Sequence, residues 1–536
     1  MSRGVRTLWR SGEPFIWLTG GALALALIMV VGLIGIILLN ALGFFWPADL
    51  VRLTLRDGKT LLGSVVERER IPGAAGQERI KLKVGNRDLY GADFVWVDEP
   101  QIARSERPPE VAVITRTEWG ELIGTITALR EGERVVAAGA AAWEEARRRL
   151  PGEAGLRAEI RRVERSDIGG INHRQEQIRL RLRGLELKGV TTGSAVDALR
   201  SEMTALQARY TTHEARLASL RGRQSTTLVV SAEGGKDKAL PLTQVLDVSF
   251  PNRMGIFAKS RHYLADVWEF VWADPRESNT EGGVFPAIYG TVMMVLIMSM
   301  LVTPLGVLAA FYLREYARQG AFVSTVRIAV NNLAGVPSIV FGVFGVGFFI
   351  YFVGGTIDRL FFAEALPTPT FGTGGILWAS LTLALLTIPV VIVATEEGLA
   401  AIPRGMREAS LALGATKLET TLRVVLPAVM PSILTGLILA MARAAGEVAP
   451  LMITGVVKLA PALPIDAAWP FVHLDRKFMH LGFHIYDVGF QSPNVDAARP
   501  MVFTTTLLLL TIVVLLNLFA IALRTRLRRR YAASAV

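Results

Sequence analysis

The chain contains no cysteine, so no disulfide bond can stabilise any part of it. Any exported segment must therefore be stable through packing alone. A complete nucleotide-binding P-loop is also missing. Gly58-Lys59-Thr60 resembles the end of that motif, but the motif requires a glycine five positions before Gly58, where this chain has Leu53. ATP hydrolysis by a P-loop within this chain is therefore excluded.

Features of nucleic-acid-binding proteins are missing too, although the formal net charge is +11 and the pI is near 10.0. No motif for stacking on bases or for reading a groove accompanies the charge. The chain is 51% hydrophobic, and charged residues are absent from several long stretches. This distribution is typical of a membrane protein, in which lysine and arginine gather at cytoplasmic helix ends. We therefore expect membrane lipid, and no nucleic acid, among its partners.

Six stretches are long and apolar enough to cross a membrane as helices. They are Phe15 to Trp46, Gly282 to Leu313, Ile328 to Ile357, Ala365 to Thr395, Val424 to Val457 and Pro500 to Leu523. Each exceeds the roughly 20 residues needed to span about 30 Å of hydrocarbon. The first is far longer than the ~7–15 apolar residues of a signal peptide, so we predict a retained helix. The predicted fold class is an all-α polytopic membrane protein with six transmembrane helices.

Basic residues between these stretches predict the orientation of the chain. They lie before the first stretch, between the second and third, between the fourth and fifth, and after the sixth. They are Arg3, Arg6, Arg10; Arg314, Arg318, Arg327; Arg404, Arg407, Lys417, Arg423; and Arg524, Arg526, Arg528, Arg529 and Arg530. Six spans place all four segments on one side, the cytoplasm. We therefore expect a multi-pass protein of a bacterial cytoplasmic (inner) membrane, with both termini cytoplasmic and residues 47–281 periplasmic.

Residues 47–281 have the character of a soluble α+β insert. Residues 51–55 alternate between apolar and polar and precede Asp57-Gly58, which is the signature of a β-hairpin. Residues 80–84 and 228–230 predict further strands. Short β segments are therefore expected on both sides of the middle of the insert.

The middle of the insert, about residues 130–223, is predicted to be an antiparallel helical hairpin. Mostly apolar residues recur there at alternating intervals of three and four, the heptad spacing of a coiled-coil seam. They are Val196, Leu199, Met203, Leu206, Tyr210, His213, Leu217 and Leu220. Gly169-Gly170 is the expected reversal point. The hairpin is either a docking arm for a partner or a pair of helices that packs only on itself.

Segment 396–431, between the fourth and fifth stretches, contains a spaced motif. Residues 407–414 read Arg-Glu-Ala-Ser-Leu-Ala-Leu-Gly, and nine residues later 424–427 read Val-Val-Leu-Pro. This resembles the signature loop of ABC-importer permeases: Glu-Ala-Ala, three residues, Gly, nine residues, Ile, one residue, Leu, Pro. Ser410 replaces the second alanine and Val424 the isoleucine. The resemblance implies that the loop couples the spans to a separate ATPase through Glu408, Ala409, Ser410, Gly414, Leu426 and Pro427.

The residue types of this loop predict a compact knob. Its first helix is expected to end at Gly414, because glycine tolerates the left-handed conformation of a helix stop. A second helix is expected to begin beyond Gly414 and to stop near Leu426-Pro427. An ordinary amphipathic connector is the alternative interpretation.

Three further stretches narrow the resemblance: Leu313 to Tyr316, Asn331 to Gly342 and Ala442 to Leu451. Over about residues 282–530 the chain looks like the PstA-type permease of phosphate ABC transporters. The resemblance implies a subunit that is not itself an enzyme and needs no cofactor. It also implies partners: a homologous PstC-type permease, two PstB-type ATPase subunits and a PstS-type periplasmic phosphate-binding protein.

With this resemblance the chain divides into four predicted parts. Residues 1–46 form the cytoplasmic N-terminus and first transmembrane helix, and 47–281 the periplasmic insert. Residues 282–523 form the permease core, with helices two to six and the coupling loop 396–431. Residues 524–536 form a basic cytoplasmic tail.

Arg443 and Glu447 lie within the fifth stretch, four residues apart on one face of the expected helix. A charge near the bilayer centre costs at least ~2.5–3.5 kcal/mol. The pair is either a mutual salt bridge that aids insertion or an anion site in the pore. Arginine offers a planar fork of donors to phosphate oxygens, and glutamate can accept a hydrogen bond from protonated phosphate, which ionised sulfate cannot donate. Gly446 and Pro450 are expected to loosen the helix.

Asn331 and Asn332 are further candidates for the substrate site. They lie near the expected start of the third span, where they would either face the pore or cap the helix.

Three histidines, His473, His480 and His484, lie in the last exported loop. A zinc site would need another ligand, such as Asp475 or Asp487. Packing against the binding protein or the partner permease is the simpler interpretation. We assign no metal site and no catalytic residue.

The sequence therefore predicts a pore-forming subunit that translocates inorganic phosphate, driven by ATP hydrolysis on a partner chain. A permease for another oxyanion, such as sulfate or molybdate, is one alternative. An envelope scaffold or sensor that acts through the coiled-coil insert is the other.

Overall fold

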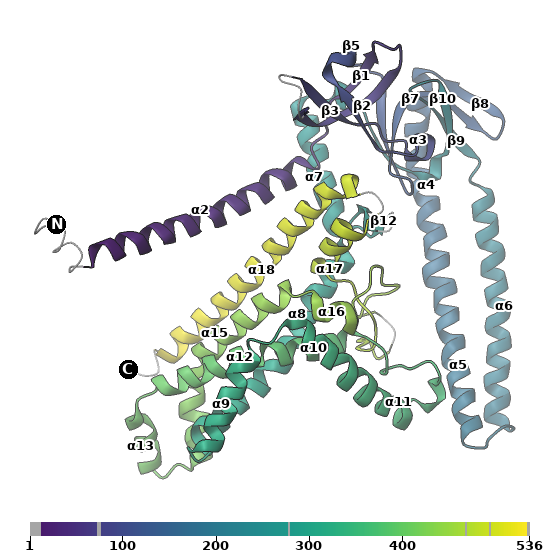
Figure 1. Cartoon of the computed structure of the whole chain (residues 1–536). Coiled ribbons are helices and arrows are strands. Elements are labelled where there is room, and N and C mark those ends of the chain that lie inside the picture. Colours follow the sequence, from purple (N-terminus) through teal and green to yellow (C-terminus); the bar gives the residue numbers. More distant parts are fainter. Residues whose placement is uncertain (1–11, 72–76, 277–278, 467–468, 493–494, 533–536) are drawn as a thin grey trace, which may run out of the picture.

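The computed structural model describes residues 12–71, 77–276, 279–466, 469–492 and 495–532 (Figure 1). The N-terminal segment with Arg3, Arg6 and Arg10, and the tail from residue 533, lie outside these ranges. Within them, six helical segments are long and apolar enough to cross a membrane. They are Phe15–Gly43, Phe285–Tyr316, Ser338–Phe361, Ile376–Ala401, Lys417–Gly446 and Ala498–Arg526. The predicted polytopic helical membrane protein is therefore confirmed.

Helix α12 (Ile376–Ala401) lies at the centre of the membrane helices, with 67% of its most apolar stretch buried. It packs against α8 (Phe285–Phe311) and α15 (Leu426–Gly446). A Cβ atom at Gly306 would lie 2.7 Å from Val391, and one at Gly436 would lie 2.7 Å from Ala394. Because small residues allow helix backbones to approach closely in membranes, these glycines fix the packing of the three central helices.

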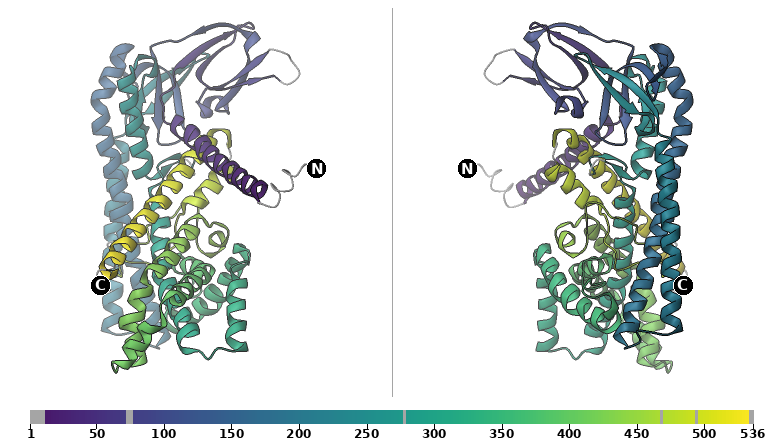
Figure 2. Two further views of the ribbon diagram at one scale, coloured as in Figure 1. Left: turned by 90° about the vertical axis from the view of Figure 1, so that its left-hand side faces the viewer. Right: turned by 90° about the vertical axis from the view of Figure 1, so that its right-hand side faces the viewer.

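The first span, α2 (Glu13–Gly43), diverges from the other helices toward its N-terminal end (Figures 1 and 2). None of its most apolar stretch is buried. Near its other end, Thr504 of α18 (Val495–Ala532) donates a hydrogen bond to the Ala41 carbonyl oxygen over 3.4 Å. Most of α2 is therefore free to contact lipid.

The predicted third stretch, Ile328 to Ile357, is not one helix. Helix α9 (Ala321–Leu333) ends before residues 334–337, and the chain resumes as α10 (Ser338–Phe344), a π-helical segment (Gly345–Gly354) and α11 (Gly355–Phe361). Pro337 has an extended backbone, with a ψ of 135°. Because proline also disfavours the helical conformation in the residue before it, α9 cannot continue into the span.

Other helices, most of them short, connect the longer elements. They are α3 (Arg87–Tyr90), α7 (Ile256–Trp272), α13 (Arg404–Ala412), α14 (Lys417–Thr420), α16 (Ala449–Thr454) and α17 (Leu481–Tyr486). Strands β12 (Pro275–Arg276) and β13 (Glu281–Gly282) pair just before α8.

Two antiparallel sheets lie at one end of the molecule (Figure 2). The first has the order β4-β3-β2-β1-β5, and the second has the order β10-β9-β7-β6-β11, with β8 also paired to β7. Their strands are β1 (Leu50–Leu55), β2 (Thr60–Arg70), β3 (Glu78–Lys83), β4 (Phe94–Asp98), β5 (Ile102–Glu106), β6 (Val111–Arg116), β7 (Glu121–Glu131), β8 (Arg134–Ala138), β9 (Thr226–Ala232), β10 (Lys236–Pro241) and β11 (Val245–Ser249). The predicted hairpin is present: Thr54 pairs with Thr60 around Gly58, which has a φ of 85°.

The sheets are more extensive than the short β segments expected from the sequence. Strands β4 to β8, β10 and β11 were not predicted. Some of them are short, such as β8 with five residues and β10 with six, and these two pair with the more buried strands β7 and β9. Their strand conformation therefore depends on tertiary pairing, which the local pattern does not encode.

A pair of long helices extends from the second sheet beside the membrane helices (Figure 1). Helix α4 (Ala140–Arg162) continues through a π-helical turn (Val163–Ile168) into α5 (Gly169–Leu187), and α6 (Ser194–Gly222) returns alongside. Ion pairs join the two paths, with 2.7 Å between Arg174 and Glu202 and 2.7 Å between Arg221 and Glu164. The coiled-coil character of this pair and its periplasmic location remain predictions.

The expected reversal at Gly169-Gly170 is wrong. Gly169 has a helical φ of −59°, and the helix runs on past it. The chain reverses between α5 and α6, where Gly189 and Gly193 have φ angles of 76° and 125°. Only glycine adopts such angles without strain, so the turn falls where these two glycines allow it.

The far end of the helical pair returns to the membrane helices. Helix α5 contacts a 3₁₀ turn (Ala363–Ala365) that follows α11. A Cβ atom at Gly184 would lie 3.8 Å from the Cβ of Glu364. The segment between the first and second spans therefore touches the membrane helices at its tip as well as at its base.

Candidate functional site

The fifth span ends in a break beside two charged residues. Helix α15 ends at Gly446, Glu447 has an extended backbone with a ψ of 132°, and α16 begins at Ala449. The predicted loosening of the helix at Gly446 and Pro450 is therefore present. Glu447 is not on the same helix face as Arg443, because it is the first residue outside the helix.

Arg443 and Glu447 nevertheless form an ion pair, with Nε and Oε1 3.5 Å apart. Their side chains are 37% and 20% exposed. Within the described residues, Nε of Arg443 makes no hydrogen bond, although this atom is itself buried. A buried guanidinium nitrogen without a hydrogen bond retains donor capacity for a ligand.

A cavity of about 320 Å³ lies one helical turn before Arg443. Its wall includes Leu439 of α15, Asn331 of α9, and Pro389 and Glu397 of α12. The structure therefore brings Asn331 to the face of α15 on which Arg443 lies, without placing either Arg443 or Asn332 in the cavity wall. Glu397 was missed from the sequence, although it is among the first charged residues after the fourth apolar stretch.

Both asparagines lie at the C-terminal end of α9 and are exposed. The sequence had placed them near the start of the third span, where one of their roles would have been to cap its first turn. That role is excluded for Asn331 and Asn332 because the span begins only at Ser338.

The predicted coupling loop folds as a compact unit at the opposite end of α15. Helix α13 ends at Ala412, and Gly414 has the predicted left-handed conformation, with a φ of 87°. Thr416 and Glu419 form a capping box at the start of α14. The Ser410 and Thr420 hydroxyl groups lie 2.9 Å apart and join α13 to α14.

The second helix of the loop does not stop at Leu426-Pro427 as expected. It continues from α14 through a π-helical turn (Thr421–Val425) into α15, so a single helical path runs from Lys417 to Gly446. Proline lacks an amide donor and breaks an ordinary helical ladder. At this position the π-helical turn changes the hydrogen-bond register just before Pro427.

The loop presents apolar side chains to solvent. Leu413 is 90% exposed, Leu418 59% and Leu411 48%. Glu408 and Ala409 of the motif are exposed beside them, whereas Leu426 and Pro427 are half-buried. Exposed apolar groups rimmed by polar residues mark interaction surfaces.

The three histidines between the fifth and sixth spans do not come together as a metal site. His473 lies 3.0 Å from Asp466, and His480 caps α17 by accepting a hydrogen bond from the Gly482 amide. Among the described residues, no group of three His, Cys, Asp or Glu side chains is placed to hold a metal ion. Burial lowers the pKa of His480 to about 3, and burial together with Lys458 lowers the pKa of His484 to about 4.

Comparison with known proteins identifies the membrane helices. Residues 302–532 match the family described as "Binding-protein-dependent transport system inner membrane component". The match covers less than half of the chain. This match and the six apolar helices together support a multi-pass inner-membrane protein. The matched family is one of transport components, as the sequence predicted, and not one of enzymes.

Several curated relatives of this permease family are named for phosphate transport. The chain is 34% identical to "Phosphate transport system permease protein PstA" of Mycobacterium leprae over 214 residues, 40% of this chain and 63% of that protein. It is 35% identical to the Yersinia pestis protein of the same name over 187 residues, 35% of this chain and 57% of the relative. The chain thus spans less than two thirds of the length of these relatives. The resemblance to PstA-type permeases is confirmed.

Among solved structures, a chain described as "Inward facing conformations of the MetNI methionine ABC transporter" is 19% identical, with a TM-score of 0.33. The match covers 49% of this chain and 97% of that one.

Proposed function

We propose that this chain is a pore-forming subunit of an ATP-driven importer of inorganic phosphate. The observation that carries the proposal is the ion pair between Arg443 and Glu447 at the break after α15. A guanidinium with an unused donor suits the oxygens of phosphate. The neighbouring carboxylate can accept the hydrogen bond that protonated phosphate donates and that sulfate cannot. The names of the PstA relatives support the same substrate.

The helix break strengthens this assignment. Because α15 ends at Gly446, the last carbonyl groups of α15 and the first amide groups of α16 lack intrahelical partners. In a membrane such groups are tolerated only where protein or water satisfies them. An aqueous substrate path beside Glu447 satisfies this condition.

We further propose that an ATPase subunit of a partner chain docks on the coupling loop. The exposed Leu411, Leu413 and Leu418 supply its apolar surface. The continuous helix from Lys417 to Gly446 leads from this surface directly to Arg443. Movement of the loop can therefore be transmitted to the substrate site through one rigid element. A PstC-type permease, two PstB-type ATPases and a PstS-type binding protein complete the proposed importer.

The proposed orientation follows from the positions of the basic residues. The coupling loop and both termini are cytoplasmic, and the sheets and long helical pair are periplasmic. An insert in that position stands beside the face on which a binding protein would deliver phosphate.

Phosphate uptake by Arg443 variants tests the substrate site. Arg443→Ala is expected to lower uptake into proteoliposomes while the complex still assembles with its partner subunits. The double variant Arg443→Ala/Glu447→Ala separates the two interpretations of the pair. If the pair is only a structural salt bridge, removing both charges should largely restore the uptake lost in Arg443→Ala. If Arg443 binds phosphate, uptake should stay low in the double variant.

Two results would oppose the proposal. Normal uptake by the Arg443→Ala variant would show that Arg443 does not bind the substrate. Equal competition by sulfate and phosphate in the unmodified importer would favour a general oxyanion permease instead.

A further inference from the structure

Helix α7 carries an exposed apolar face between the second sheet and α8. Leu264 is 66% exposed, Trp268 67% and Trp272 54%. Their spacing of four residues places them on one side of the helix. Three large apolar side chains on one side of a short helix form a surface that needs a partner or a nonaqueous environment.

The opposite side of α7 is firmly packed. The ring of Tyr263 lies 6.3 Å from that of Phe45 and 6.2 Å from that of Trp46, measured between centroids. Phe270 is only 4% exposed, and its ring lies 5.3 Å from that of Phe45. The exposed face therefore belongs to a helix that is held in place, with a fixed direction relative to the end of α2.

The C-terminal half of α7 lies level with the ends of three spans. Phe270 packs in one apolar cluster with Ala498 and Met501, at the start of the apolar part of α18. Trp272 stacks on Phe285, the first residue of α8, with ring centroids 5.5 Å apart. Phe45, the neighbour of Phe270, lies two residues after the end of α2.

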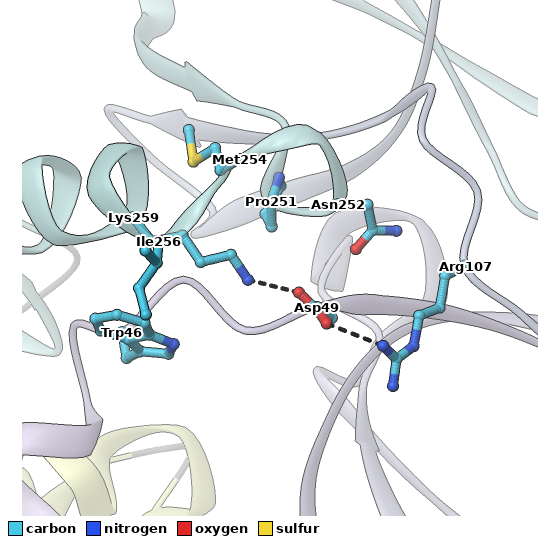
Figure 3. Close-up of a pocket in the computed structure, with 8 residues that line it drawn as sticks. All are labelled: Trp46, Asp49, Arg107, Pro251, Asn252, Met254, Ile256 and Lys259. Atoms are coloured by element: carbon cyan, nitrogen blue, oxygen red, sulfur yellow. Dashed lines mark hydrogen bonds and ion pairs between the residues drawn. The ribbon is translucent and has the colours of Figure 1, made fainter.

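The N-terminal half of α7 carries exposed apolar side chains, Ile256 at 69% and Phe257 at 90%, beside charged ones. It borders an open cavity of about 370 Å³ in which Lys259 and Arg107 both pair with Asp49 (Figure 3). Trp46 lies on the side of this cavity nearest the end of α2 (Figure 3). The N-terminal half of α7 thus combines charged and apolar side chains.

We propose that the face of α7 formed by Leu264, Trp268 and Trp272 lies in the lipid interface of the membrane. The other side of α7 packs against Phe45 and Trp46, just after α2, and none of the most apolar stretch of α2 is buried. Tryptophan is enriched at the boundary between headgroups and hydrocarbon because its ring is amphipathic, and Trp46 provides another at this level. A helix whose other side is polar or packed and whose free side is apolar suits this position. This position of α7 depends on the six spans crossing a membrane, and it does not depend on phosphate being the substrate.

The absence of cysteine makes a direct test possible. Leu264→Cys and Trp268→Cys are each labelled with a nitroxide in the full chain and placed in vesicles of phosphatidylcholine and phosphatidylglycerol. Val135→Cys, on the distant strand β8 with 51% of Val135 exposed, is the matched control. Accessibility to oxygen, which concentrates in lipid, is compared with accessibility to a water-soluble nickel chelate.

The logarithm of the oxygen-to-chelate ratio is expected to be positive at positions 264 and 268 and negative at 135. A negative value at both test positions would place the face in water and overturn the proposal. Low accessibility to both reagents would also overturn it, because a protein partner or a second copy would then cover the face. Using two positions keeps the test valid if one variant fails to fold.

Discussion

The guanidinium of Arg407 donates a hydrogen bond to the carboxylate of Glu315, with Nη2 and Oε1 2.9 Å apart. Arg407 lies in α13, and Glu315 lies in the π-helical turn (Tyr312–Tyr316) that follows α8. The same guanidinium donates to the carbonyl oxygens of Leu399 and Ile402, at the end of α12. One side chain therefore attaches α13 to the ends of both the second and the fourth spans.

Arg407→Ala is expected to weaken coupling between ATP hydrolysis and uptake. The Arg407 and Glu315 side chains are only 20% and 15% exposed, and a hydrogen bond to a charged group contributes about 1.5–3 kcal/mol. With α13 detached from the spans, uptake per ATP hydrolysed should fall in proteoliposomes that contain the complete importer. Arg404→Ala, which removes an exposed arginine of the same helix, is the control. Equal uptake per ATP in the two variants would contradict this role of Arg407.

Gly414→Ala is expected to distort the turn between α13 and α14. Its φ of 87° costs a residue with a Cβ about 1–2 kcal/mol, whereas no described atom lies within 4 Å of where the Cβ would be. Backbone strain, not a clash, should therefore lower the affinity for the ATPase subunit, measured by co-purification. Gly405→Ala is the matched control, because Gly405 lies within α13 and alanine favours a helix. A loss as large with Gly405→Ala would show that strain at Gly414 is not the cause.

Acid is expected to destabilise the loop between the fifth and sixth spans through His480 and His484. Their pKa values are lowered to about 3 and about 4 in the folded chain, from an ordinary value of 6.5. The unfolded state therefore binds more protons than the folded state, so stability is retained above pH 6.5 and lost as pH falls below it. Each histidine costs up to about 1.4 kcal/mol per pH unit in that window.

The difference in melting temperature between pH 7 and pH 5 measures this effect. Replacing both histidines with glutamine, which does not titrate, should reduce that difference. His173→Gln, in the long helical pair, is the control. An unchanged difference in the double variant would show that other groups cause the acid sensitivity.

Much of the membrane part could be predicted from the sequence because its signals are local. Long uncharged stretches predict the spans, and fixed spacing carries the resemblance of residues 407–427 to a coupling loop. The left-handed Gly414 and the break at Gly446 also follow from residue type alone. The continuous helix through Pro427 did not follow, because a π-helical turn that accommodates a proline leaves no simple pattern.

The segment between the first and second spans was harder to predict because its structure depends on distant contacts. Arg116 illustrates this: it is 2% exposed and pairs with Asp88, 28 residues away, at 3.1 Å. No periodicity brings those two residues together. The cavity beside Leu439 likewise depends on how α9, α12 and α15 pack, so Glu397 could not be assigned to it from its own neighbours.

A disulfide between Gly184→Cys and Glu364→Cys is expected to form upon mild oxidation. A Cβ at Gly184 would lie 3.8 Å from that of Glu364, within the range of about 3.5–4.5 Å found in disulfides. Because the natural chain has no cysteine, mass spectrometry of a digest can identify the bond without competing pairs. Gly170→Cys/Glu364→Cys, with the cysteine fourteen residues earlier on the same helix, is the control. Cross-linking of both pairs to the same extent would show that the tip of the helical pair is not held against the turn after α11. Selective cross-linking at position 184 would confirm that the long helices lie against that turn.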